Sequence, residues 1–483
     1  MKLITLLKDI PYHLVLGDTN QEVDSIIYDS RVKTNNGLFV AIKGFNTDGH
    51  KYIHAAIENG AKTIVIEDEV ELKQSGITVI KVEDTRLVMA KLASNFYDHP
   101  SQKLELVGVT GTNGKTSITF LLGQLLEAYG KKIGIIGTIE NRIGTNILKA
   151  QRTTPESADL QQLLATMHKE GVSHCLMEVS SHALALNRVE SCEFKLGIFT
   201  NLTQDHLDFH KTMEAYGEAK ALLFKRCQVG IANEDSTYVN MMKENATCKM
   251  ITYGIHKPAD YHASDIHITA GGVSYNLQTP EGEYKVEVPI PGEFSVYNSL
   301  AVICAARQLG LPMDFIIDHL RVVKGVPGRV QSFQSPKGYS VLVDYAHTPD
   351  GLENVLETIK QFAKGRIITV FGCGGDRDNT KRPLMGEVAA KYSDEVIITS
   401  DNPRSEDPYV ILDQVEVGVK RHQVDYIKME DRKEAIYHAL GHAKKDDVVL
   451  IAGKGHENYQ ILKERIIHFD DSEIVREFIQ GEQ

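Results

Sequence analysis

The chain has 483 residues, of which 42% are hydrophobic and 24% charged, a composition typical of a globular protein. At this length we expect about three domains, each with its own core. The formal net charge of -12 disfavours sequence-independent binding to nucleic acid, which requires a basic surface that displaces counterions. Because local clusters of arginine and lysine can outweigh the overall charge, an anionic small-molecule substrate is still allowed.

The amino terminus does not have the pattern of a signal peptide. Charged residues and Pro11 interrupt its apolar stretch, and no small-residue cleavage site follows. No apolar run reaches the about 18 residues that a membrane span needs. We therefore expect a cytoplasmic chain that is not inserted in a membrane, does not bind nucleic acid, and acts as a monomer on small molecules.

Six cysteines are scattered along the chain without a C-x-x-C pair. They are Cys175, Cys192, Cys227, Cys248, Cys304 and Cys373. This spacing indicates neither a disulfide framework nor a zinc site, and we expect most of these thiols to be buried.

Residues 1–98 are predicted to form a first α/β domain. A polar turn, Asp29-Ser30-Arg31, separates two strand-like runs, and residues 47–68 have the pattern of a helix followed by a strand. The hydroxyl and guanidinium of the turn could hold a phosphate or a uracil edge, or they could cap their own backbone. A helical pattern ends ahead of Pro100, which places the domain boundary there.

The stretch 104–129 has the most specific pattern in the chain. An apolar run changes into a turn rich in threonine and glycine, and a helical pattern begins at Lys115. The turn contains Gly111, Thr112, Asn113, Gly114, Lys115, Thr116 and Ser117, and the apolar helix positions are Ile118, Leu121, Leu122, Leu125, Leu126 and Tyr129. Such a helix start favours a phosphate, and the Thr116 hydroxyl suits a metal ion bound to it. Because Val109 replaces the first glycine of the general P-loop pattern, the turn could alternatively bind nothing.

The second domain, residues 99–330, continues with alternating strands and helices. Strands are predicted at 132–137, 175–179 and 196–202, with a helix at 158–170. This alternation indicates a mostly parallel sheet with helices on both faces, whose ligands bind at the carboxyl ends of the strands. Residues 261–291 have the pattern of a small antiparallel excursion, a helix is predicted at 296–309, and 325–329 has the composition of a hinge.

Two strand ends in this domain present polar side chains. Glu178 ends an apolar run where a carboxylate could face a metal-bound nucleotide, although it could also be a helix cap or a surface acid. Asp205, His206, Asp208 and His210 follow the next strand, and such a cluster predicts at least one contact to a metal or a substrate.

Two further segments allow both a functional and a structural interpretation. Thr153, Thr154 and Glu156 precede a helix, where they could hold an anion or cap the helix. Lys220 lies in a helical stretch, and its spacing alone indicates a solvated lysine whose stem covers apolar surface.

Residues 331–483 are predicted to form a third α/β domain in which four strands end in polar residues. These are Asp344 and His347, then Asp376, Arg377 and Asp378, then Asp401, Asn402 and Arg404, and finally Gly453, Lys454 and Glu457. Because parallel strands end at one edge of a sheet, the four ends predict a ligand crevice. The glycine turns alone do not predict a dinucleotide, since no acid follows at a spacing of about 20 residues.

Nine motifs occur in the order found in the Mur ligases of peptidoglycan synthesis, which the chain resembles. They are TGTNGKTS, EVSSHAL, NLTQDHLDFH, EAKALLF, YNSLAVICAA, GVPGR, DYAHTPD, GCGGDRD and DNPR. The resemblance covers the whole chain and is strongest to the members that add the third amino acid of the peptide. It implies an α/β fold of three domains: a UDP-sugar-binding domain, a central ATP-binding domain of P-loop type, and a Rossmann-like domain that binds the amino acid.

The resemblance implies an ATP-dependent amide ligation that uses Mg²⁺. The γ-phosphoryl group of ATP passes to the D-glutamyl γ-carboxylate of a UDP-N-acetylmuramoyl dipeptide, an amine of meso-diaminopimelate attacks the acyl phosphate, and phosphate leaves. Bringing a carboxylate to a triphosphate requires neutralisation by Mg²⁺ and cationic side chains.

The resemblance also implies roles for four groups of residues. The ATP group is Gly111, Thr112, Asn113, Gly114, Lys115, Thr116, Ser117, Asn298, Arg329 and Asp344. The UDP-sugar dipeptide group is Ser30, Thr153, Thr154, Ser180 and Arg188. The diaminopimelate group is Arg377, Asp401, Asn402, Pro403, Arg404, Gly453 and Glu457. The metal group is Thr116, Glu178, His206 and Lys220, the last as a carbamate that holds a second magnesium ion.

Two details bear on these implied roles. Leu186 replaces a glutamine found in some relatives, so that substrate contact is not expected here. Arg404 can bind the extra carboxylate that distinguishes diaminopimelate from lysine, because a guanidinium pairs with a carboxylate through two hydrogen bonds.

Three alternative functions are left open by the sequence: a lysine-adding homologue, a folylpolyglutamate-type ligase and a non-catalytic P-loop switch protein. Since the ligands are divided between domains, we also expect the third domain to rotate about the hinge.

Overall fold

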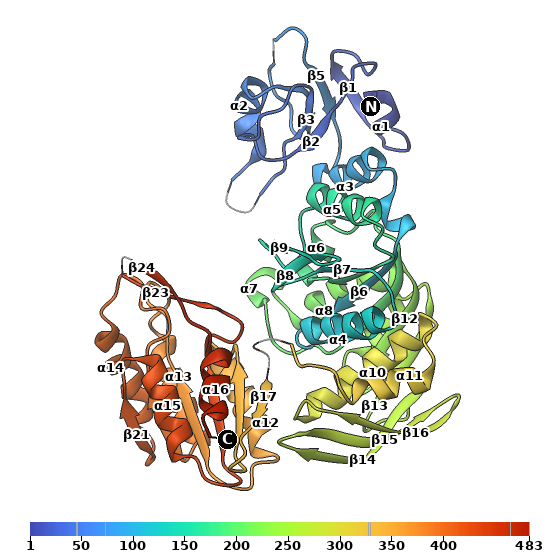
Figure 1. Ribbon diagram of the computed structural model, residues 1–483. Helices are drawn as coiled ribbons and strands as arrows, with labels where there is room; N and C mark the ends of the chain where they lie inside the picture. The colour runs from blue at the N-terminus through green and yellow to red at the C-terminus, as the bar shows by residue number, and fades with distance from the viewer. Residues whose placement is uncertain (45–46, 73, 327, 329, 464, 483) are drawn as a thin grey trace. The chain divides into compact units, whose positions relative to one another are not determined.

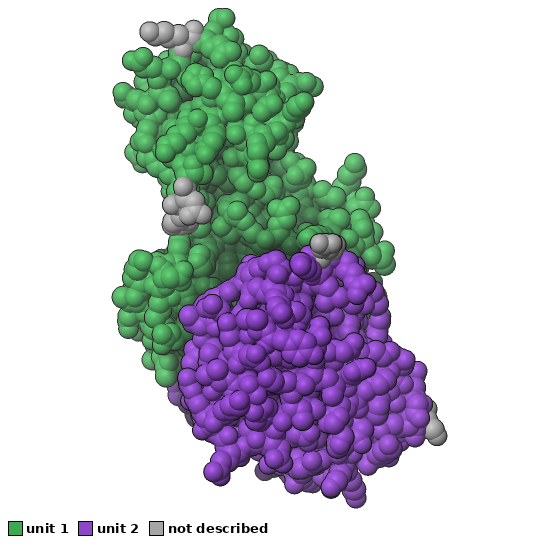
Figure 2. Space-filling view, turned by 90° about the vertical axis from the view of Figure 1, so that its left-hand side faces the viewer, with its two compact units in different colours: residues 1–253, 304–308 green, residues 254–303, 309–483 purple. Residues whose placement is uncertain are grey.

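The computed structural model describes residues 1–44, 47–72, 74–326, 328, 330–463 and 465–482 (Figure 1). They form two compact units, Met1–Tyr253 with Cys304–Gln308, and Gly254–Ile303 with Leu309–Gln483 (Figure 2). The predicted α/β class is confirmed, and the boundaries of the three domains stay a prediction. No helix in the described ranges is both long and apolar enough to cross a membrane.

The amino-terminal part of the first unit contains a sheet of strand order β1-β5-β4-β3-β2. Its elements are α1 (Leu3–Leu6), β1 (His13–Leu16), β2 (Ser25–Ile27), β3 (Gly37–Val40), η1 (Gly49–Tyr52), α2 (Ile53–Glu58), β4 (Ala61–Ile66), β5 (Thr78–Lys81), α3 (Thr85–Phe96) and η2 (Pro100–Lys103). Strands β2 to β5 run parallel, and β1 is antiparallel to β5. The predicted polar turn lies between β2 and β3, and α3 ends just ahead of the predicted boundary at Pro100.

The larger sheet of the first unit is built on parallel strands in the order β13-β12-β11-β6-β10-β7, followed by the antiparallel hairpin β8-β9. The strands are β6 (Glu105–Thr110), β7 (Ile133–Ile136), β8 (Glu140–Ile143), β9 (Asn146–Lys149), β10 (His174–Glu178), β11 (Phe194–Phe199), β12 (Cys227–Asn233) and β13 (Lys249–Gly254). The helices are α4 (Lys115–Ala128), α5 (Ser157–Lys169), α6 (Ser181–Ala185), α7 (Leu207–His210), α8 (Met213–Ala221), η3 (Leu222–Lys225) and α9 (Val239–Asn245). The predicted mostly parallel sheet is therefore confirmed.

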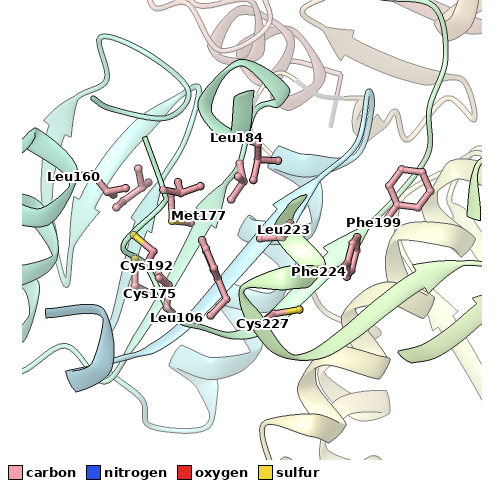
Figure 3. Packing of buried hydrophobic residues seen from close by; sticks show 14 of the residues in the cluster. Leu106, Leu160, Cys175, Met177, Leu184, Cys192, Phe199, Leu223, Phe224 and Cys227 are labelled. Carbon is pink, nitrogen blue, oxygen red and sulfur yellow. The ribbon is translucent and has the colours of Figure 1, made fainter. Parts of the chain in front are cut away.

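The core under this sheet is formed by apolar side chains that the sequence places at strand and helix spacing. Figure 3 shows Leu106, Met177, Leu184, Leu223 and Phe224 packed together with neighbouring thiols. On α4 the predicted apolar positions are buried, except that Tyr129 caps the end of the helix and is 39% exposed. Five of the six cysteines are buried, as expected, and Cys248 is half-buried.

The second unit begins with the predicted antiparallel excursion. It consists of β14 (Tyr261–Thr269), β15 (Gly272–Thr279) and β16 (Gly282–Val288), followed by α10 (Glu293–Gln308) and α11 (Met313–Leu320). The predicted helix at 296–309 thus begins three residues earlier than the sequence pattern indicated. Within the expected hinge, Pro327 and Arg329 lie outside the described residues.

The rest of the second unit is a sheet of strand order β17-β18-β22-β19-β20-β21. Its elements are β17 (Gln331–Gln334), β18 (Ser340–Asp344), α12 (Pro349–Lys360), β19 (Ile367–Phe371), α13 (Lys381–Tyr392), β20 (Glu395–Ile398), α14 (Pro408–Val419), β21 (Asp425–Lys428), α15 (Arg432–His442), β22 (Val448–Ala452), the separate hairpin β23 (Tyr459–Leu462) and β24 (Arg465–His468), and α16 (Asp471–Gln480). Apart from β17 and the hairpin, these strands run parallel, so the four predicted strand ends lie at one edge.

Candidate active site

The predicted nucleotide turn joins β6 to α4. Gly114 precedes the helix in the left-handed conformation, and the Thr112 and Asn113 N–H groups bond the main-chain and side-chain oxygens of Asn201. The Nζ of Lys115 donates to the carbonyl oxygens of Gly111 and Thr112, at 2.9 and 2.8 Å. The Lys115 amine therefore lies against the turn that precedes α4. A helix start that also carries a lysine amine suits a phosphate group.

The glycine at position 111 is required by a neighbouring strand. Its φ of 147° is unusual for other residues, and a Cβ there would lie 1.8 Å from Thr200 Oγ1. That hydroxyl donates to the Asn113 carbonyl oxygen at 2.6 Å, which ties the turn to the end of β11. Gly111 thus lets the nucleotide turn pack closely against Thr200 at the end of β11. The sequence pattern did not indicate this reason for a glycine.

Glu178 ends β10 beside the nucleotide turn. The parallel register pairs Glu178 with Val109 of β6, so its carboxylate emerges at the edge where the turn begins. The side chain is 1% exposed, and its Oε1 accepts a hydrogen bond from the Thr116 hydroxyl at 3.0 Å. Thr138 donates to both carboxylate oxygens, with N–Oε1 and Oγ1–Oε2 distances of 2.9 and 3.0 Å. The alternative that Glu178 is a surface acid or helix cap is therefore wrong.

Lys220 is buried, which contradicts the solvated position that its spacing indicated. On α8 its side chain is 1% exposed, its Nζ donates to the Gly111 carbonyl oxygen at 2.9 Å, and it lies 4.4 Å from the centre of the Tyr216 ring. Burial, and secondarily the charge of Lys115, holds the pKa of Lys220 well below its usual value. Helical spacing could not reveal this, because the covering atoms come from a turn more than a hundred residues away in sequence.

The histidine cluster is divided between a buried and an exposed position. His206 adopts a left-handed backbone conformation, is 47% exposed and places Nε2 3.3 Å from Asp205 Oδ2. His210 is buried and shares a hydrogen bond with Ser181 Oγ at 2.9 Å, so its contacts are structural. His182 of α6 lies between them, with ring centres 4.8 Å from His206 and 5.5 Å from His210. Neither a metal nor a substrate contact of His206 is tested by this arrangement, and that role stays a prediction.

The predicted dipeptide-binding threonines lie next to the Glu178 strand end. The Thr154 hydroxyl donates to the Glu178 carbonyl oxygen at 2.9 Å and accepts the Ser180 N–H at 3.1 Å. Ser180 in turn caps α6 through its hydroxyl. Thr153 Oγ1 lies 3.0 Å from Thr138 Oγ1. These residues therefore form one polar surface beside the carboxylate, although Ser180 also serves the structural role of a cap.

Arg188 belongs to a group of three arginines around one buried carboxylate. Its Nη2 lies 2.9 Å from Glu156 Oε1, and Arg86 and Arg152 also pair with Glu156. Burial lowers the pKa of Arg188, with Glu156 opposing that effect. Three guanidinium groups against Glu156 and the nearby Asp159 leave an excess of positive charge, which suits an anionic substrate.

The amino-terminal turn makes the local contacts that the capping alternative describes. The Asp29 carboxylate accepts the Arg31 main-chain N–H at 3.0 Å and pairs with its guanidinium at 2.6 Å. These bonds lower the pKa of Asp29 to about 2. The role of the Ser30 hydroxyl as a substrate contact is not tested by the structure and stays a prediction.

In the third predicted domain, Asn402 and Glu457 are held together by a buried lysine. Asn402 Nδ2 donates to Glu457 Oε2 at 2.9 Å, and its Oδ1 accepts the Ile461 N–H at 2.9 Å. The Nζ of Lys454, which is fully buried, lies 3.1 Å from Glu457 Oε2 and 3.3 Å from Asn402 Oδ1. The predicted ends of β20 and β22 thus converge, and the lysine neutralises the carboxylate.

Arg404 has a left-handed backbone, with φ of 52°. Its main-chain N–H donates to the Ile461 carbonyl oxygen at 3.1 Å, and its guanidinium Nη1 donates to the Gly375 carbonyl oxygen at 2.6 Å. Such a conformation costs about 1–3 kcal/mol in a non-glycine residue and is often found at functional sites. The neighbouring loop fixes the direction of this half-buried guanidinium.

The other predicted residues of this group occupy the same strand ends. Asp401 and Pro403 are buried, Arg377 is exposed on the turn after β19, and Gly453 donates its N–H to the Asp344 carbonyl oxygen at 3.1 Å. The Asp344 carboxylate accepts the N–H groups of Val330 and Ala346, both at 2.8 Å. Asn298 lies on α10, and Arg329 lies outside the described residues. Their predicted nucleotide contacts stay predictions.

One metal-like group was not expected from the sequence. In the described part of the chain, three potential ligand atoms of Asp48, His50 and Asp68 lie within 4.8 Å of one another. However, His50 Nδ1 bonds Asp48 Oδ1 at 2.6 Å, and its Nε2 accepts the N–H groups of Glu67 and Asp68. Both ring nitrogens are engaged, so the group stabilises a turn.

Sequence reasoning also missed several residues of the site. Thr138 and Arg86 were not singled out, and Lys454 was noted only as part of a strand end. Thr138 follows β7 directly, so the rule that polar residues at strand ends mark a site would have found it. Arg86 gave no such signal, because it lies on α3 and its partner Glu156 is distant in sequence.

Three family models match the chain. The one described as Mur ligase middle domain matches residues 109–306, Mur ligase, glutamate ligase domain matches 328–455, and Mur ligase family, catalytic domain matches 22–97. The chain belongs to the Mur ligase family. Several of the motifs that suggested this resemblance, among them TGTNGKTS, EVSSHAL and DNPR, lie at the strand ends described above.

The relatives of this Mur ligase match it along its length. It is 51% identical over 483 residues to the UDP-N-acetylmuramoyl-L-alanyl-D-glutamate–2,6-diaminopimelate ligase of Clostridioides difficile, with 99% of each chain covered. The protein of the same name from Caldanaerobacter subterraneus is 48% identical over 480 residues, again with 99% of each covered. A solved structure of a ligase of that name is 33% identical, has a TM-score of 0.76, and covers 100% of this chain and 99% of its own.

Proposed function

We propose that this chain is an ATP-dependent ligase that joins meso-diaminopimelate to UDP-N-acetylmuramoyl-L-alanyl-D-glutamate, a step of peptidoglycan precursor synthesis. One observation carries the proposal: a phosphate-type turn meets a buried carboxylate, Glu178, in a chain that matches ligases of this name over 99% of its length. The relatives supply the substrate names, and the geometry supplies the reason why these residues suit the chemistry.

The nucleotide would bind to the turn between β6 and α4. The N–H groups at the start of α4 and the Lys115 amine favour the phosphates of ATP. The Thr116 hydroxyl and the Glu178 carboxylate, 3.0 Å apart, are oxygen donors of the kind that Mg²⁺ prefers. When bound, Mg²⁺ would neutralise the charge between the substrate carboxylate and the triphosphate.

The first chemical step is phosphoryl transfer. An oxygen of the D-glutamyl γ-carboxylate attacks the γ-phosphorus of ATP, the bond from that phosphorus to the bridging oxygen breaks, and ADP leaves. The arginine group around Glu156, with Thr153 and Thr154, would hold the anionic dipeptide so that its carboxylate is in line. The protein contributes mainly position and charge, as is usual for phosphoryl transfer.

Lys220 would act in this step as a carbamate. The low pKa of its buried Nζ leaves the amine neutral more often than an exposed lysine. A neutral amine can attack carbon dioxide, forming a nitrogen–carbon bond and releasing one proton. The resulting anion would offer oxygen atoms to a second magnesium ion and would no longer repel Lys115.

The second chemical step is amide formation. An uncharged amine of diaminopimelate attacks the acyl carbon, the tetrahedral species expels inorganic phosphate, and the amine loses its proton. Arg404 would bind one carboxylate of diaminopimelate, and Asn402 with Glu457 would receive its remaining amine and carboxylate groups. With lysine bound, Arg404 would lose that partner and leave a partly buried charge unpaired, which disfavours lysine.

The test is release of phosphate from ATP with the UDP-linked dipeptide and either meso-diaminopimelate, L-lysine or no amino acid. Release that depends on diaminopimelate is expected. Release with lysine alone would keep the ligase and overturn the specificity. No release with either amino acid would overturn the ligase and favour a folylpolyglutamate-type ligase or a switch protein.

A further inference from the structure

The two residues after β7, Gly137 and Thr138, surround the Glu178 carboxylate. Strands β7 and β10 are parallel, and Ile136 pairs with Met177, so the chain leaving β7 runs directly beside Glu178. A Cβ on Gly137 would lie 2.5 Å from Glu178 Oε1. A side chain at position 137 would therefore displace the carboxylate from its present position.

Thr138 holds both oxygens of that carboxylate. Its main-chain N–H donates to Oε1 at 2.9 Å and its hydroxyl donates to Oε2 at 3.0 Å. Thr116 donates the third hydrogen bond, to Oε1 at 3.0 Å. An ionised carboxylate accepts hydrogen bonds only, so these three donors fix its orientation.

The hydroxyl of Thr138 has one proton, and it donates this proton in a hydrogen bond to the Glu178 carboxylate. Thr153 Oγ1 lies 3.0 Å from Thr138 Oγ1, and either hydroxyl could be the donor by distance alone. Because the Thr138 proton points to Glu178, the Thr153 hydroxyl must donate to Thr138. Thr153 then has only lone pairs to present to a ligand.

We propose that Thr138 is a positioning residue that couples the dipeptide-binding loop to the metal-binding carboxylate. It fixes Glu178 for magnesium through two hydrogen bonds, and it orients the Thr153 hydroxyl as an acceptor for an N–H or O–H group of the dipeptide substrate. This inference rests on the proposed function, because Thr153 and Glu178 take their ligands from it. It adds a residue that acts through both of these side chains.

The first test is the magnesium dependence of binding of N-methylanthraniloyl-ADP to the full-length protein. Thr138→Val removes the hydroxyl with little change in shape, and Thr138→Ser keeps it. We expect the half-saturating Mg²⁺ concentration to rise roughly tenfold in Thr138→Val, since a hydrogen bond to a charged group contributes enough for such a factor. Thr138→Ser should bind as the wild type does.

A matched control is Thr369→Val on β19. Thr369 is fully buried whereas Thr138 is exposed, and the Thr369 hydroxyl pairs with that of Ser393 at 2.7 Å, so the same substitution again removes a hydrogen-bonding hydroxyl. It should leave the magnesium dependence unchanged. Equal magnesium dependence in Thr138→Val and wild type would overturn the role at Glu178, and thermal unfolding of each variant shows whether it is folded.

The second test is a double-mutant cycle on the KM for the UDP-linked dipeptide at saturating Mg²⁺. Thr138→Val and Thr153→Val should each raise KM, and the double variant should raise it little more than either alone, because the two hydroxyls act as a unit. Effects that multiply would overturn the coupling. A wild-type protein without ligase activity would instead overturn the proposed function, and the nucleotide-binding test would still decide the role of Thr138 at the carboxylate.

Discussion

The Nζ of Lys220 lies 2.9 Å from the carbonyl oxygen of Gly111, inside the first unit and at the base of the nucleotide turn. A side chain that helical spacing assigns to solvent is thus placed beneath the phosphate-type site. Its buried amine has a low pKa, the state in which a lysine reacts with carbon dioxide. This contact gives the carbamate role of Lys220 a physical basis.

We expect Lys220→Ala to lower diaminopimelate-dependent phosphate release by at least about 100-fold, the size of effect seen when one preorganised electrostatic group is removed. Added short-chain carboxylic acids should restore part of the activity, because their carboxylate can occupy the space of the carbamate. The control is Lys225→Ala, which changes an exposed lysine of η3. Lack of any rescue would indicate that Lys220 acts as an ordinary cation.

Arg404→Ala should raise the KM for diaminopimelate by roughly 10- to 100-fold, since it removes a charge-assisted pair with the substrate carboxylate. Steady-state phosphate release at varied amino-acid concentration measures this change. The KM for L-lysine should change much less, so the difference between the KM values for diaminopimelate and L-lysine becomes smaller. Arg421→Ala, which breaks an exposed pair with Glu387, should leave both values unchanged. An equal loss for both amino acids would show that Arg404 holds the loop and does not select the substrate.

The third prediction concerns stability. Arg432 and Asp471 form a bidentate pair that is fully buried, with distances of 2.8 and 2.7 Å, and Arg432 also bonds the carbonyl oxygen at the end of β22. We expect Asp471→Ala to lower the free energy of unfolding by about 3–5 kcal/mol, because the arginine charge loses its partner in the interior. Urea unfolding followed by circular dichroism measures this change.

The neighbouring exposed pair provides the comparison. Lys433 and Glu477 lie 3.0 Å apart on the same two helices, and Lys433→Ala should change the free energy of unfolding far less than Asp471→Ala, because water screens exposed pairs. Replacing both buried partners, as Arg432→Met with Asp471→Leu, should recover much of the lost stability. If Asp471→Ala cost no more than Lys433→Ala, the buried pair would not stabilise this unit.

The fourth prediction is a pH dependence of stability. Burial, with His182 and Lys220 nearby, lowers the pKa of His210 to about 4, below its unfolded value of about 6.5. Between these values the unfolded chain binds a proton that the folded chain excludes. The free energy of unfolding should therefore fall as the pH drops from about 6.5 towards 4, by at most about 1.4 kcal/mol per pH unit from this group.

Urea midpoints between pH 7.5 and about 5 test this slope. His210→Gln removes the titrating ring and should flatten the slope by the share of one proton. His422→Gln, an exposed histidine, should leave the slope as it is in the wild type. A variant slope equal to that of the wild type would show that His210 takes up its proton without unfolding.

Local patterns determined which elements form. Alternation of apolar strands with helices predicted the parallel sheets, and the observed strands β7, β10 and β11 differ from the predicted ranges by up to three residues. Their ends shifted because a helix or strand boundary depends on caps and neighbouring strands as well as on its own residues. The Thr/Gly turn and the polar strand ends were also predictable, since they follow from the rule that ligands bind where parallel strands end.

The partners of the side chains were not predictable in this way. The bonds from Thr138 to Glu178, from Arg86 and Arg188 to Glu156, and from Asn402 to Glu457 join residues that are distant in sequence. Periodicity shows which face of an element is apolar, but it contains no information on which polar group is buried against which other.

By itself, then, the sequence determined the α/β class, the order of the elements and the motifs of a Mur ligase, because these depend on propensity and spacing within short segments. The tertiary structure alone decided the burial of Lys220, the cradle of Gly137 and Thr138 around Glu178, and the left-handed Arg404 against β23. The physical reason is that burial and charge pairing depend on atoms brought together by folding.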